Sequence, residues 1–114
     1  HRGLSPAFTV VTGHREKGGA SGIDWESLAR VGGTIVVLMG VTERAQIARR
    51  LIAGGLAPTT PVAAIRFGTR ADQTTRRFTL SSLASEPLES PTTIVIGAVA
   101  ALDFSPRREL SEVV

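Results

Sequence analysis

The sequence predicts a small α/β domain, built on a mixed sheet that helices flank. Strand-like and helix-like segments alternate along the chain, which is typical of βαβ units. Continuous apolar runs of strand length stand at 34–39, 61–67 and 92–102, and such runs indicate strands covered on both faces. With 114 residues, of which 42% are hydrophobic and 20% charged, the chain has the size and composition of one globular domain.

The first segments read as a strand, a loop and a short helix. Residues 8–12 are β-branched and apolar, which predicts a strand that breaks at Gly13. Residues 15–22 are polar and rich in glycine, as in a loop. Asp24 can cap a short helix, which the glycines at 32–33 end.

The middle of the chain contains the strongest helical pattern. Residues 34–39 predict a buried strand, and Thr42 is the expected cap of the helix that follows. The apolar side of this helix is expected to hold Ala45, Ile47, Ala48, Leu51 and Ile52. Gly54 and Gly55 stop the helix, and residues 61–67 form the next apolar strand. Strand, helix and strand together predict one βαβ unit.

The last third is less regular. Residues 77–80 predict a further strand, and 81–84 the start of a short helix. Residues 92–102 predict the last strong strand, interrupted by Gly97.

Several classes of protein are disfavoured by what the sequence lacks. Without cysteine there is no disulfide, no thiolate metal site and no cysteine nucleophile. The apolar runs are shorter than the roughly 20 residues of a membrane helix, so we expect a soluble, cytoplasmic domain with no membrane partner. No H-E-x-x-H or G-x-S-x-G motif occurs, so we expect no metal and no serine hydrolysis. We also expect no nucleic-acid partner, because stacking aromatic residues are few.

Three strand ends carry candidate functional residues. His14 follows the first strand and could contact a carboxylate or move a proton, although a histidine in a loop can also just bond local backbone. Met39 and Gly40 end the strand at 34–39; a methionine there can pack on a flat ring or fill a gap in the core. Gly68 ends the strand at 61–67, so two neighbouring strands would present glycine turns suited to a nucleotide-like ligand, or ordinary turn chemistry.

Other features of the sequence concern partners and completeness. Every cation except Lys17 is an arginine, which suits anionic partners but also an ordinary solvated surface. The apolar strands outnumber the helices available to cover them, and His14 has no obvious second catalytic group beside it. We therefore expect a fragment of a longer polypeptide.

The ordered motifs F-T-V-V-T-G-H, D-W-E-S-L-A, G-G-T-I-V-V-L-M-G-V, P-x-T-P-V-A-x-I-x-x-G-T and P-T-T-I-V-I-G-x-V closely resemble the C-terminal half of uroporphyrinogen-III C-methyltransferases, within the tetrapyrrole methylase superfamily. The resemblance implies the C-terminal domain of that fold over residues 1–102, and a polar tail over 103–114. It also implies a two-domain enzyme that binds S-adenosylmethionine between its halves. Such an enzyme methylates uroporphyrinogen III twice, giving precorrin-2 for sirohaem or cobalamin and S-adenosylhomocysteine as the by-product.

The resemblance further implies roles for four residues. Arg2 and His14 would face the tetrapyrrole substrate, and Met39 and Gly68 would contact the cofactor. The glycine-rich cofactor loop and the proton acceptor lie in the N-terminal half, so this chain alone is expected to be inactive. A homodimer is also expected. The alternatives are a non-catalytic dimerisation or ligand-binding module of the same fold, and a methylase for another corrin precursor or for a diphthamide intermediate.

Overall fold

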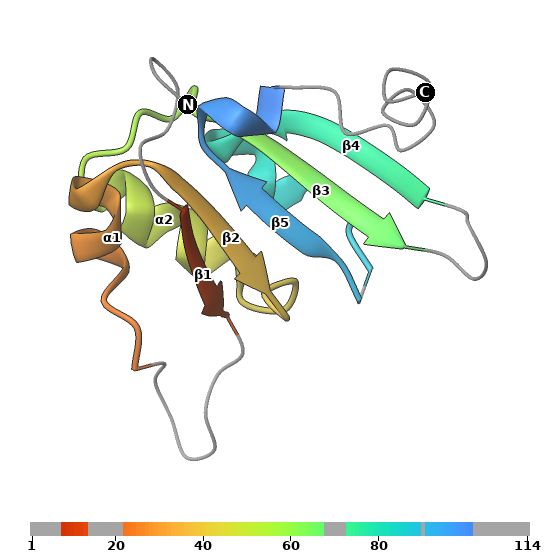
Figure 1. The fold of residues 1–114 in the computed structure, drawn as a ribbon, viewed down its shortest axis with the longest axis horizontal. Coiled ribbons are helices and arrows are strands. Elements are labelled where there is room, and N and C mark those ends of the chain that lie inside the picture. The colour runs from red at the N-terminus through yellow and green to blue at the C-terminus, as the bar shows by residue number, and fades with distance from the viewer. Residues whose placement is uncertain (1–7, 14–21, 68–72, 90, 102–114) are drawn as a thin grey trace, which may run out of the picture.

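The computed structural model describes residues 8–13, 22–67, 73–89 and 91–101. Within these residues, five strands form one mixed sheet in the order β1-β2-β5-β3-β4 (Figure 1). The strands are β1 (Phe8–Thr12), β2 (Thr34–Leu38), β3 (Pro61–Phe67), β4 (Gln73–Thr79) and β5 (Thr93–Ile96). The helices are α1 (Trp25–Val31) and α2 (Arg44–Ala53), with 3₁₀ turns η1 (Leu80–Ser85) and η2 (Ala98–Ala101). The predicted mixed α/β fold is confirmed.

The pairing of the strands corrects the predicted βαβ unit. β1 and β2 are parallel, whereas β5 is antiparallel to both β2 and β3. Strands β2 and β3 therefore point the same way, but β5 lies between them. The directly paired βαβ unit is β1–α1–β2, and the unit from β2 through α2 to β3 is split by a strand from far along the chain.

One face of the sheet packs against α1, α2 and η1 and forms the main core. This core contains Trp25, Ala29, Ile35, Val37, Ile47, Ala48, Leu51, Val62, Leu80, Leu83, Ile94 and Ile96. A smaller cluster on the other face, where η2 contributes Ala100, contains Ala63, Ile65 and Val95. The expectation that both faces of the strand at 34–39 are covered holds where the strand begins, at the buried Thr34 and Ile35, and is wrong where it ends, at the exposed Leu38.

The two helices begin differently. Asp24 caps α1 as predicted, since its carboxylate accepts a hydrogen bond from the Ser27 backbone N–H at 3.1 Å. The predicted cap of α2 by Thr42 is wrong: α2 begins at Arg44 and lacks a side-chain cap bond. Instead, Nη1 of Arg44 folds back and donates to the Val41 carbonyl at 2.6 Å. Ala45, expected on the apolar side of α2, is exposed, whereas the predicted Ile47, Ala48 and Leu51 are buried.

The last predicted strand is too long. β5 ends at Ile96, and the chain then turns at Gly97, whose φ is 135°. The apolar residues that follow form η2 across the second face instead of extending the strand. Conversely, β4 begins at Gln73, earlier than predicted, because it pairs with β3 along all seven residues. Residues 103–114, the predicted tail, lie outside the described residues.

Candidate functional site at the ends of the parallel strands

The strands β1, β2 and β3 all end at one edge of the sheet. Their common direction follows from the pairing, and Figure 1 shows their arrowheads pointing the same way. In open α/β sheets this edge is where ligands bind. The two glycine turns that we predicted to be neighbours are not adjacent. β5 separates the ends of β2 and β3, and two strand spacings amount to about 10 Å.

The true neighbour of the β2 end is Gly13, at the end of β1. Its backbone N–H donates to the Leu38 carbonyl at 2.7 Å, continuing the parallel pairing. A Cβ on Gly13 would lie 2.8 Å from Cγ1 of Val37 and 2.9 Å from the Cα of Gly40. A Cβ on Gly40 would lie 2.5 Å from the same Cγ1 atom. All three distances are shorter than packed atoms tolerate, so a side chain at either position would force its neighbours to shift.

These residues form what we call the glycine contact: Gly13 and Gly40, with Val37 beneath them and Ile47 of α2 behind. Val37 and Ile47 are buried to 0% and 1% exposure. The contact fixes the ends of β1 and β2 against each other and against α2. Sequence reasoning singled out both glycines as strand ends, but it did not predict that they touch.

Met39 stands between β2 and Gly40 in an unusual backbone conformation. Its φ is 55°, and among the described residues no other residue except glycine has a positive φ. A left-handed backbone costs an ordinary residue roughly 1–2 kcal/mol. The side chain is nevertheless 63% exposed, so Met39 does not fill a gap in the core. A strained backbone that presents an exposed thioether at a ligand-binding edge suggests a functional role.

The other predicted site residues cannot be placed beside Met39. Arg2, His14 and Gly68 lie outside the described residues. His14 follows Gly13 directly in the sequence, and Gly68 follows the last residue of β3. The geometry on which a site can be argued therefore consists of Met39 and the glycine contact.

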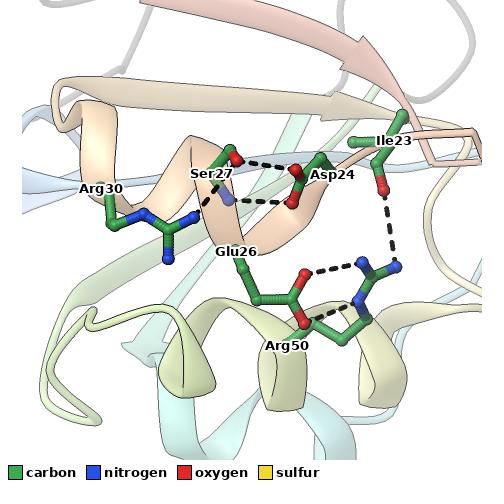
Figure 2. A network of polar contacts seen from close by, with 6 residues as sticks. All are labelled: Ile23, Asp24, Glu26, Ser27, Arg30 and Arg50. Carbon is green, nitrogen blue, oxygen red and sulfur yellow. Dashed lines mark hydrogen bonds and ion pairs between the residues drawn. The ribbon is translucent and has the colours of Figure 1, made fainter.

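A polar network joins the two helices and was not anticipated from the sequence (Figure 2). The Arg50 guanidinium donates from Nη2 and Nε to the two oxygens of Glu26, at 2.6 and 3.1 Å. Its Nη1 also reaches the Ile23 carbonyl at 3.5 Å. Hydrogen bonds from Arg50 hold the pKa of Glu26 below its usual value, and those from Ser27 do the same for Asp24. This network fastens the start of α1 to α2.

In the described ranges, no three His, Cys, Asp or Glu side chains are gathered so that they could hold a metal ion. None of the helices found there is long and apolar enough to cross a membrane.

Comparison with known proteins identifies the class of protein to which this fold belongs. The sequence model of one protein family, the tetrapyrrole (corrin/porphyrin) methylases, matches residues 4–84 of the chain. The chain belongs to this family. It is 44% identical over 107 residues to an S-adenosyl-L-methionine-dependent uroporphyrinogen III methyltransferase of Methanosarcina barkeri, covering 90% of this chain and 42% of that protein. It is 43% identical over 104 residues to siroheme synthase 1 of Serratia proteamaculans, covering 90% of this chain and 22% of that protein.

Solved structures agree with the family. A uroporphyrin-III C-methyl transferase from Thermus thermophilus, complexed with S-adenyl homocysteine, matches with a TM-score of 0.75 and 33% identity, covering 87% of this chain and 45% of that one. A cobalt precorrin-4 methyltransferase shares the fold, with a TM-score of 0.73 at 17% identity. The chain thus spans less than half the length of each of these relatives.

Proposed function

We propose that this chain is the C-terminal half of an S-adenosylmethionine-dependent uroporphyrinogen-III C-methyltransferase that makes precorrin-2. The observation that carries the proposal is Met39, which is strained and exposed at the ligand-binding edge of a tetrapyrrole methylase fold. The names of the relatives and their greater length support both the reaction and the assignment to one half. Residues 1–102 form the domain, and 103–114 form a tail.

Met39 suits a cofactor that carries a flat ring and a sulfonium. A thioether is polarisable and packs well on flat rings, and the exposed side chain has no competing place in the core. Gly68, at the end of β3, would offer backbone groups to the same cofactor. When bound, S-adenosylmethionine supplies an electrophilic methyl group.

The remaining site residues would act on the substrate. Arg2 can grip a carboxylate of the polycarboxylate macrocycle with its planar fork. His14 would orient the macrocycle so that a nucleophilic pyrrole carbon stands in line with the methyl group. The protein's main task is this positioning, since the bond formed and the bond broken belong to the substrate and the cofactor. The proton acceptor would come from the N-terminal half.

The two halves provide the first test. This chain, a separately produced N-terminal methylase half, and their mixture are each incubated with uroporphyrinogen III and S-adenosylmethionine. We expect turnover in the mixture only. The complete enzyme is further proposed to be cytoplasmic and to form homodimers. Turnover by this chain alone would contradict the division of labour.

A second measurement separates the enzyme from a non-catalytic module of the same fold. Calorimetric titration of S-adenosylhomocysteine into the mixture should show saturable binding that the Met39→Ala variant weakens. Lack of binding by the unaltered mixture would favour the module.

A further inference from the structure

A surface cavity lies on the helix-covered face of the β3–β4 hairpin. Its volume is about 170 Å³. The sheet contributes Ala64, Arg66, Thr74 and Arg76, and the segment before β5 contributes Pro87, Leu88, Glu89 and Thr92. The Thr92 hydroxyl donates to the Glu89 carbonyl, which holds this segment in a turn.

The register of β3 against β4 places two arginines and a threonine around this cavity. Arg66 lies directly opposite Thr74, and Arg76 lies opposite Ala64. Arg66 and Arg76 are therefore diagonal neighbours on one face, about 7–8 Å apart at their backbones. Two guanidinium groups thus line one small cavity.

The two arginines differ in how well they are neutralised. Nη2 of Arg76 lies 2.7 Å from Oε1 of Glu86, a hydrogen-bonded ion pair. Nη2 of Arg66 lies 3.7 Å from Oε1 of Glu89, which is too long for a hydrogen bond. Glu89 is also 78% exposed, so water screens the pair. Among the described residues, the Arg66 guanidinium has only this long and exposed ion pair with Glu89, so its fork is available to a carboxylate that competes with Glu89.

The cavity therefore has one available guanidinium, a facing hydroxyl and apolar walls. A planar guanidinium fork matches a carboxylate, and the Thr74 hydroxyl can add a third donor. Ala64, Pro87 and Leu88 offer apolar surface suited to methylene groups. The cavity is open to solvent, because Arg66, Thr74, Arg76, Pro87 and Glu89 are all exposed, and its volume of about 170 Å³ is enough for a short side chain.

We propose that this cavity binds a carboxyalkyl group, with Arg66 as its bidentate partner and Glu89 as a competing carboxylate. The proposal rests on the proposed function for the source of that group. The source is either a carboxylate side chain of the tetrapyrrole or the carboxylate end of S-adenosylmethionine. Arg66 is the second-last residue of β3, so the cavity opens near the edge where that strand ends.

Two substitutions with opposite expected effects test the proposal in the complete enzyme, that is, this chain with its N-terminal half. Arg66→Gln should raise the KM for one of the two substrates, uroporphyrinogen III or S-adenosylmethionine, about tenfold, because a charge-assisted bidentate contact is lost. Glu89→Gln should lower the same KM, because the competitor is removed. A changed KM for uroporphyrinogen III identifies a tetrapyrrole side chain as the bound group, and a changed KM for S-adenosylmethionine identifies the carboxylate end of the cofactor. Arg49→Gln, on the exposed side of α2, is the matched control and should leave both KM values unchanged.

If the Arg66–Glu89 pair serves only the fold, both variants act in the same direction, and the proposal is overturned. It is equally overturned if the enzyme turns over normally and neither KM moves, a result that leaves the proposed function intact. A second readout needs no turnover. Sodium propionate is titrated into the same protein while the amide resonances of Thr74, Leu88 and Thr92 are followed by NMR. Saturable shifts that Arg66→Gln abolishes support the site even where methyl transfer fails. Shifts that persist in Arg66→Gln contradict it.

Discussion

The glycine contact makes a quantitative prediction about stability. Substituting Gly40→Ala would place a Cβ 2.5 Å from Cγ1 of the fully buried Val37. Because the site is packed, the added methyl group forces side chains or backbone to move, at a cost of about 1–3 kcal/mol of unfolding free energy. The φ of Gly40 is not in the left-handed region, so this cost comes from crowding alone.

Val37→Ala removes the crowding atom and should rescue Gly40→Ala. After Cγ1, the nearest atoms to the new Cβ are Cδ1 of Ile47 at 3.4 Å and Cβ of Val37 at 3.6 Å, both tolerable contacts. The single Val37→Ala variant should itself lose stability through a cavity. The two changes should therefore be non-additive, with a favourable coupling of about 1–3 kcal/mol. Gly13→Ala should resist this rescue, because its Cβ would also lie 2.9 Å from the backbone Cα of Gly40.

Urea unfolding followed by Trp25 fluorescence measures these effects directly. Trp25 is the only tryptophan and is 2% exposed in the core beside α2. Gly22→Ala is the matched control, since no atom lies within 4 Å of its added Cβ, and it should change stability by less than about 0.5 kcal/mol. The reasoning is refuted if the double variant loses as much stability as the two single variants together.

Three further predictions concern the site and the helices. Met39→Gly relieves a left-handed backbone that costs roughly 1–2 kcal/mol, but it adds the roughly 0.5–1 kcal/mol that glycine loses in chain entropy on folding. We therefore expect urea unfolding to show a stabilisation of up to about 1 kcal/mol, and the complete enzyme to show a raised KM for S-adenosylmethionine. A clear loss of stability would contradict the strain at Met39. The lowered pKa values of Glu26 and Asp24 add stability above their unfolded values of 4.5 and 3.8, and that contribution is lost as the pH falls through the lower folded values. Glu26→Gln should accordingly flatten the acid limb of the unfolding profile, and an unchanged limb would contradict the network of Figure 2. His14→Ala should lower methyl transfer with little change in cofactor affinity, and unaltered turnover would remove His14 from the site.

The local features of the fold were readable from the sequence. Continuous apolar runs predict the strands, and Asp24 is recognisable as a cap because its side chain bonds a backbone group only three residues away. The features that failed depend on distant parts of the chain. No local pattern says that β5 inserts between β2 and β3, or that residues after Gly97 fold across the second face as η2.

The candidate site shows the same division. Met39 and Gly40 were singled out because a glycine at the end of an apolar strand is a local signal. The left-handed backbone of Met39 and its exposure depend on tertiary packing, which the sequence does not spell out. The contact between Gly13 and Gly40 joins two strands 27 positions apart, and the Glu26–Arg50 pair joins two helices 24 positions apart. Pairings of this kind become visible only once the chain is folded.

The mass of the reaction product tests the central claim most directly. The complete enzyme is incubated with uroporphyrinogen III and S-adenosylmethionine, and the tetrapyrrole is then examined by mass spectrometry. We expect a gain of two methyl groups, with S-adenosylhomocysteine formed in a ratio of two to one. An unchanged tetrapyrrole, in an enzyme that still binds the cofactor, would contradict the proposed substrate and leave a methylase of this family acting on another compound.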